Sequence, residues 1–89
     1  MTTILIIEDD AVLRGLLAKQ LTKDGYSVVE AACWAEAERH LREREPAAII
    51  MDARLPDGDS ASRLPSLVGE FPVIVLTAFG SVREAVNAI

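Results

Sequence analysis

Acidic residues follow short apolar runs of this sequence, in places where a carboxylate could do chemistry. Glu8, Asp9 and Asp10 follow one run, and Asp52 follows a second. Thr77 follows a third run and offers a hydroxyl donor. Like charges a few ångströms apart are costly unless a cation lies among them or a proton is taken up. If the ends of these runs meet in the fold, the group is suited to holding a hard divalent cation.

The three apolar runs have the length and the β-branched content of strands. They extend from Ile4 to Ile7, from Ala47 to Met51 and from Val73 to Leu76. None of them alternates polar with apolar residues, which is typical of strands covered on both faces in a parallel sheet. A weaker run, Tyr26 to Ala31, is predicted to be an edge strand.

Helical patterns separate these runs. Between Val12 and Leu21, apolar residues recur at three- and four-residue spacing, and Gly25 follows as a helix stop in the left-handed conformation. A second helix is predicted from Ala35 to Arg44, with Ala37 and Leu41 directed inward.

The third and fourth helices carry clearer local signals. Pro65 interrupts the helical stretch from Ser60 to Glu70, and a proline inside a helix costs about 3 kcal/mol or more. We therefore expect that helix to be short, displaced or begun at Pro65. A capping box from Ser81 to Glu84 predicts the start of the fourth helix.

The alternation of strands and helices predicts right-handed crossovers and a parallel sheet with helices on both sides. In such sheets, ligands bind outside the carboxyl ends of the strands. If the first and third strands are neighbours, the side chains of Glu8, Asp9 and Asp52 converge there. Mg²⁺ binds through a few carboxylates plus a phosphate, and a carboxylate beside such an ion is well placed to attack phosphorus.

Three segments of the sequence resemble the signature segments of bacterial two-component response regulator receiver domains. They are Ile4 to Asp10, Ile49 to Gly58 and Val73 to Ala78. Their order and spacing follow the family, so residues 1–89 are expected to form one receiver domain, incomplete at its C-terminus. The resemblance implies a flavodoxin-like, doubly wound α/β fold with strand order 2-1-3-4, in which the family's fifth strand and helix are missing.

The resemblance also implies a role for each acidic residue. Glu8 and Asp9 would be the metal-binding pair, and Asp52 would be both the phosphoacceptor and a metal ligand. The backbone carbonyl of Arg54 would complete the shell of Mg²⁺, for which Mn²⁺ could substitute.

Two further residues and the function follow from the same resemblance. Thr77 would be the switch hydroxyl that contacts the phosphoryl group, and Ala78 the small neighbour that leaves the site open. A histidine kinase or a phosphotransfer protein would donate the phosphoryl group. An output domain of the parent chain, expected to regulate transcription, would respond. The domain is thus expected to be a phosphoacceptor rather than an enzyme, apart from catalysing its own Mg²⁺-dependent phosphorylation and dephosphorylation.

The composition of the chain limits which binding partners and which cellular compartment are expected. A net charge of −5 argues against direct contact with nucleic acid. No apolar run approaches the ~20 residues that span a bilayer, and Cys33 has no second cysteine with which to form a disulfide. We expect a cytoplasmic domain without membrane contact. The single His40 is predicted to face solvent and provides no metal site.

Simpler roles exist for the acidic residues. Glu8, Asp9 and Asp10 could begin a helix, where acidic side chains favour the positive end of the dipole and Asp10 could cap amides. Asp52 could be a turn aspartate before the turn sequence Leu55 to Gly58.

Other function classes lack the motifs that they need. A metal-dependent phosphohydrolase that forms an aspartyl-phosphate would carry a second aspartate two residues after the first, where Arg54 follows Asp52. A dinucleotide-binding domain would carry glycines after the first strand, where Glu8, Asp9 and Asp10 stand.

A third possibility is an interaction scaffold that is not phosphorylated, because the family's lysine-bearing fifth strand does not occur before Ile89. Without that strand, Val73 to Leu76 would be an open sheet edge, which is a template for pairing with another chain. A homo-oligomer through this edge is therefore expected.

Overall fold

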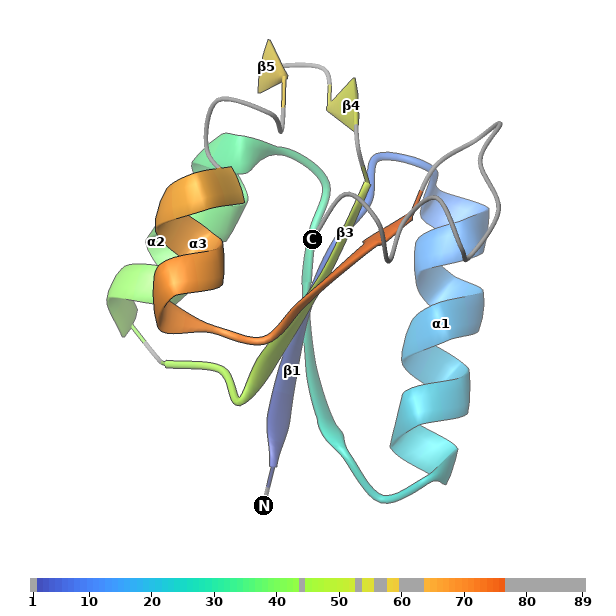
Figure 1. Ribbon diagram of the computed structural model, residues 1–89. Helices are drawn as coiled ribbons and strands as arrows, with labels where there is room; N and C mark the ends of the chain where they lie inside the picture. Colours follow the sequence, from blue (N-terminus) through green and yellow to red (C-terminus); the bar gives the residue numbers. More distant parts are fainter. Residues whose placement is uncertain (1, 44, 53, 56–57, 60–63, 77–89) are drawn as a thin grey trace.

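The computed structural model describes residues 2–43, 45–52, 54–55, 58–59 and 64–76 (Figure 1). Four parallel strands form the main sheet in the order β2-β1-β3-β6. They are β1 (Thr3–Ile7), β2 (Ser27–Ala31), β3 (Ala48–Asp52) and β6 (Val73–Leu76). Counted along the main sheet, β6 is the fourth strand, so the predicted order 2-1-3-4 is confirmed.

Helices cover both faces of this sheet. The helix α1 (Ala11–Lys23) lies on one face, and α2 (Trp34–Glu43) and α3 (Leu64–Glu70) lie on the other (Figure 1). This arrangement is the doubly wound α/β architecture predicted from the alternating pattern. None of the described helices is long and apolar enough to cross a membrane.

A small antiparallel pair follows β3. It consists of β4 (Arg54–Leu55) and β5 (Gly58–Asp59), and Leu55 pairs with Gly58. The sequence predicted a turn between these two residues but not the short strands on either side of it.

The main core lies between the sheet and the pair α2 and α3. Successive side chains of a strand point to opposite faces, so alternate residues of β1, β3 and β6 enter this core. Its buried members are Leu5, Ile7, Ala31, Trp34, Ala37, Ile49, Met51, Leu67, Val73 and Val75. The predicted inward direction of Ala37 is confirmed, and Leu41 packs against the same cluster.

The face of α1 that meets the sheet differs from the predicted stripe. None of the 13 residues of α1 is buried. Leu17 and Leu21 are half-buried, whereas Val12 and Leu16 are 73% and 61% exposed. The stripe was therefore wrong in part. Arg14 lies with Leu17 and Leu21 on the less exposed side of the helix, at helical spacing.

The end of α1 confirms the predicted helix stop. Gly25 has φ 98°, in the left-handed region that a residue with a Cβ rarely adopts. Its N–H donates to the carbonyl of Thr22 at 3.1 Å, and the Tyr26 N–H donates to the carbonyl of Leu21 at 3.0 Å. These two bonds form a Schellman motif, which ends the helix and turns the chain toward β2.

The third helix also agrees with its prediction. It has seven residues, and Pro65 occupies its first turn, where no intrahelical N–H bond is lost. The predicted helix that begins with the Ser81 to Glu84 capping box lies outside the described residues.

The burial pattern predicts which side chains stabilise the fold. Ile49 is 0% exposed in the main core, so Ile49→Ala should lower the free energy of unfolding by roughly 2–5 kcal/mol. Val12→Ala, at a 73% exposed position, should change it by no more than about 0.5 kcal/mol. Urea denaturation followed by circular dichroism measures both. Equal losses in the two variants would contradict this assignment of the core.

Candidate metal centre

Three acidic side chains meet at the carboxyl end of the central strands. Glu8 and Asp9 follow β1, Asp52 ends β3, and these two strands are parallel neighbours. One carboxylate oxygen from each residue lies within 4.8 Å of the other two. We call Glu8, Asp9 and Asp52 the acidic cluster. The structure thus brings together three of the four predicted metal ligands.

The three members differ in their access to solvent. Glu8 is 3% exposed, Asp52 is half-buried and Asp9 is exposed. The main chain of Glu8 continues the sheet pairing, because its N–H donates to the carbonyl of Ala31 in β2 at 2.9 Å. The cluster is therefore anchored at Glu8 and open to solvent at Asp9.

Burial changes the protonation of the cluster. The pKa of Glu8 is raised from 4.5 to about 7, and desolvation by burial is the largest cause. A hydrogen bond from the backbone of Asp10 lowers the pKa, and the nearby carboxyl groups of Asp52 and Asp9 raise it. That bond joins the Asp10 N–H to Glu8 Oε1 at 3.1 Å. Near neutral pH, Glu8 is therefore present in both protonation states. A bound cation would compensate the negative charge in place of the proton.

The donor atoms of the cluster fit a hard divalent cation. All three side chains offer carboxylate oxygen, which is the ligand type of Mg²⁺, Mn²⁺ and Ca²⁺, whereas zinc sites are richer in nitrogen and sulfur. Arg54, whose carbonyl was predicted to be the fourth ligand, begins β4 two residues after Asp52, and its role stays a prediction. Thr77 and Ala78 lie outside the described residues.

Asp10 caps the start of α1, as the sequence predicted for this residue. Its side chain accepts hydrogen bonds from the N–H groups of Val12 at 3.0 Å and Leu13 at 3.2 Å. It thereby satisfies two amides that α1 cannot satisfy itself. Because Glu8 and Asp9 join Asp52 instead, the simpler interpretation holds for Asp10 alone.

Asp52 is a strand residue rather than a turn residue. It is the last residue of β3 and pairs with Leu76 of β6. The antiparallel pairing of β4 with β5, which follows in the chain, begins only at Arg54. Neighbouring strands on both sides of β3 therefore fix the main chain that carries this carboxylate.

Arg14, for which the sequence predicted no role, contacts the main chain of the cluster. One terminal nitrogen of its guanidinium, Nη1, donates to the carbonyl oxygen of Glu8 at 2.7 Å. Its Nε lies 3.3 Å from Oε1 of Glu30 in β2. A signal was present in the sequence, because Arg14 lies at helical spacing from Leu17 and Leu21.

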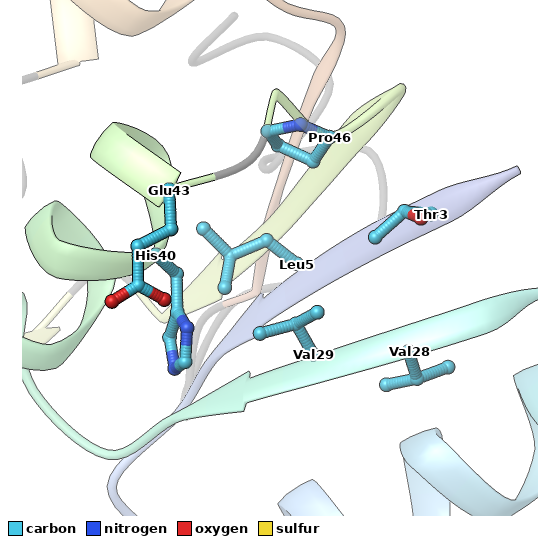
Figure 2. Close-up of a pocket in the computed structure, with 7 residues that line it drawn as sticks. All are labelled: Thr3, Leu5, Val28, Val29, His40, Glu43 and Pro46. Atoms are coloured by element: carbon cyan, nitrogen blue, oxygen red, sulfur yellow. The ribbon is translucent and has the colours of Figure 1, made fainter.

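A hollow of about 290 Å³ lies far from the cluster, toward the amino ends of the strands. Figure 2 shows the side chains that line it, which are Thr3, Leu5, Val28, Val29, His40, Glu43 and Pro46. His40, which was predicted to face solvent, is half-buried and lines this hollow. The hollow shares no residue with the acidic cluster and is therefore separate from it.

Comparison with known proteins points to one family. Residues 4–89 match the sequence model of the response regulator receiver domain. The chain is 38% identical over 88 residues to the transcriptional regulatory protein GlrR of Escherichia coli (strain K12), and the match covers 96% of this chain and 20% of GlrR. The chain therefore spans about a fifth of the length of that relative.

Solved structures give the same result. A response regulator protein from Burkholderia pseudomallei, with a phosphorylated aspartic acid, a calcium ion and citrate, is 28% identical with a TM-score of 0.83, over 99% of this chain and 54% of that one. The beryllofluoride-activated NtrC4 receiver domain, a dimer in solution, is 31% identical with a TM-score of 0.81, over 99% of this chain and 75% of that one.

The raised pKa of Glu8 predicts how stability depends on pH. Its value is about 7 in the folded protein and 4.5 as a free side chain, so the folded state holds the proton more tightly. The stabilisation from this proton is complete below about pH 4.5 and is lost as the pH rises through about 7. Without divalent cations, the free energy of unfolding should therefore fall over this range, by a few kcal/mol at most.

Urea denaturation at a series of pH values, in a chelating buffer, measures this dependence. Glu8→Gln cannot titrate and should remove the loss, whereas Glu36→Gln on α2 should keep it. Mg²⁺ should restore stability at high pH in the unsubstituted protein. A Glu8→Gln profile that still falls as in the unsubstituted protein would show that another group is responsible.

Proposed function

Because the chain belongs to the response regulator receiver domain family, we propose that Asp52 accepts a phosphoryl group in a Mg²⁺-dependent reaction. The family match confirms the resemblance recognised in the sequence. The observation that supports the assignment of Asp52 is the acidic cluster, in which this carboxylate lies within 4.8 Å of two other carboxylates. The proposed donor is the phosphohistidine of a histidine kinase or of a phosphotransfer protein.

The residues of the cluster have different tasks in this proposal. A carboxylate oxygen of Asp52 attacks the phosphorus atom, the bond from phosphorus to the donor imidazole nitrogen breaks, and its electron pair leaves with the imidazole. Glu8, Asp9 and Asp52 would hold Mg²⁺, with the Arg54 carbonyl as a further ligand. When bound, Mg²⁺ supplies positive charge that offsets the charge of the phosphoryl oxygens during transfer.

The position of Asp52 supports its role as the nucleophile. The residue is half-buried at the end of a strand that pairs on both sides, so its carboxylate is held at a defined place while one side of the cluster is open at Asp9. A positioned nucleophile is worth more than a mobile one, because phosphoryl transfer depends mainly on alignment and charge.

Thr77 and Ala78 complete the proposal on the side of the phosphoryl group. The Thr77 hydroxyl would donate to a phosphoryl oxygen, and the small Ala78 would leave room for that group. Hydrolysis of the aspartyl-phosphate by water, assisted by the same cation, would end the signal. The domain would thus catalyse its own phosphorylation and dephosphorylation without acting on another substrate.

The relatives support a regulatory setting for this chemistry. GlrR is a transcriptional regulatory protein, and this chain matches 20% of it, so we propose that a transcriptional output domain responds to Asp52 in the parent protein. A cytoplasmic location is proposed on the same grounds. Association of two copies is supported by the NtrC4 receiver dimer and by Ile74 of β6, which is 53% exposed. Pairing through the β6 edge stays a prediction.

Phosphorylation tests the proposal against an unphosphorylated scaffold. Acetyl phosphate with Mg²⁺ should label the protein on Asp52, and Asp52→Asn, which removes the attacking oxygen at almost unchanged volume, should reduce labelling to background. Asp9→Asn should lower the labelling rate by at least about tenfold, the loss typical even of residues that only support metal ligands. Intact-mass spectrometry measures the product.

Asp24→Asn is the matched control, because Asp24 is an exposed aspartate at the end of α1. It should be labelled as fast as the unsubstituted protein. Undiminished labelling of Asp52→Asn would reject Asp52 as the acceptor. A properly folded protein that takes up no label with Mg²⁺ present would favour the scaffold.

A further inference from the structure

Arg14 is the one side chain described in α1 that bonds to the main chain at the acidic cluster. Its side chain is 20% exposed, and its guanidinium lies between α1 and β2. Its Nη1 donates to the Glu8 carbonyl at 2.7 Å, and the two residues are six positions apart in the sequence. A donor that carries a full charge makes this bond stronger than one between neutral groups.

This bond completes the set of contacts that fix Glu8. The N–H of Glu8 donates to the Ala31 carbonyl at 2.9 Å, and its carboxylate accepts from the Asp10 N–H at 3.1 Å. The carbonyl is the remaining polar group of the residue, and Arg14 binds it. Since the peptide bond that follows this carbonyl leads directly to Asp9, its orientation affects where the Asp9 carboxylate lies.

Glu30 orients the guanidinium for this contact. It pairs with Ile6 in the register of β2 and β1, two residues before Glu8 along β1. Its Oε1 lies 3.3 Å from Nε of Arg14, at a different nitrogen from the one that binds Glu8. The planar guanidinium can serve both acceptors at once, which the single ammonium group of a lysine at this position would do poorly.

We propose that Arg14, oriented by Glu30, is a positioning residue for the metal centre: by fixing the Glu8 carbonyl it holds Glu8 and Asp9 in the arrangement that binds a divalent cation. This inference rests on the proposed function, because it assumes that the acidic cluster binds Mg²⁺. Arg14 itself does not touch the cation. Replacing a residue that orients a metal ligand without touching the metal typically weakens metal binding by about 10–100-fold.

The test measures Mg²⁺ affinity and stability separately. Mg²⁺ is titrated into the protein and followed by Trp34 fluorescence and by two-dimensional amide NMR, and thermal unfolding is recorded without metal. Arg14→Gln should weaken Mg²⁺ binding by about tenfold or more. Glu30→Gln keeps an acceptor oxygen and should stay within about fivefold of the unsubstituted protein. Arg14→Lys should lie between Arg14→Gln and the unsubstituted protein.

Lys19→Gln is the matched control, because it removes the same charge from an exposed position of α1. It should bind Mg²⁺ as the unsubstituted protein does, which separates positioning from a general loss of positive charge. An Arg14→Gln protein that melts earlier yet binds Mg²⁺ with unchanged affinity would overturn the inference and leave a structural role only. If Arg14→Gln does not fold, Arg14→Lys decides, and an unchanged affinity in that variant overturns the inference.

The same titration separates this inference from the proposed function. Binding that is present in the unsubstituted protein and lost in Asp9→Asn supports the metal centre, whatever Arg14 does. Binding that survives Asp9→Asn combined with Asp52→Asn would show that the cation binds elsewhere, and the proposed function would then fail before Arg14 is considered.

Discussion

The carboxyl groups of Glu8, Asp9 and Asp52 lie within 4.8 Å of one another, and their repulsion must be compensated by a proton or by a cation. The sheet holds these side chains together, because the parallel pairing of β1 with β3 brings the carboxyl ends of both strands to the same edge. Glu8 cannot turn to solvent, since it is 3% exposed and bonded to β2 through its N–H. Without a metal, Glu8 compensates the repulsion by holding a proton, which its raised pKa reflects. A divalent cation would serve the same purpose and also bring positive charge to an incoming phosphoryl group.

The elements around the cluster limit how far it can relax. On one face, α2 and α3 pack on β1, β3 and β6 through an apolar core in which Trp34 is the largest fully buried side chain. On the other face, Ile4 and Ile6 of β1 are buried, whereas no residue of α1 is fully buried. Its first turn is capped by Asp10, and Arg14 bonds to the Glu8 carbonyl. The Schellman motif at Gly25 then returns the chain to β2, whose Ala31 carbonyl binds Glu8. A helix with little buried surface can thus still influence the site.

The sequence was sufficient for the sheet and for the meeting of the acidic residues. Apolar runs without alternation are typical of buried parallel strands, and the rule that sites form at strand ends then places Glu8, Asp9 and Asp52 together. It was not sufficient for the orientation of α1, because helical periodicity predicts an apolar stripe without stating which part of it meets the sheet. The exposure of Val12 and the inward position of Arg14 depend on that rotation. The partial burial of His40 likewise depends on how α2 packs on the strands, which the sequence pattern does not state.

The central claim is that Asp52 is the phosphoacceptor beside a metal bound by the acidic cluster. A crystal structure of the protein with Mn²⁺ and beryllofluoride tests it most directly, because anomalous scattering locates the metal and the beryllium adduct marks the acceptor oxygen. The account predicts beryllium on a carboxylate oxygen of Asp52 and Mn²⁺ bound by oxygen atoms of Asp9 and Asp52, with Glu8 facing the ion. Beryllium on another carboxylate, or Mn²⁺ bound elsewhere, for example beside Glu43 in the hollow, would contradict it.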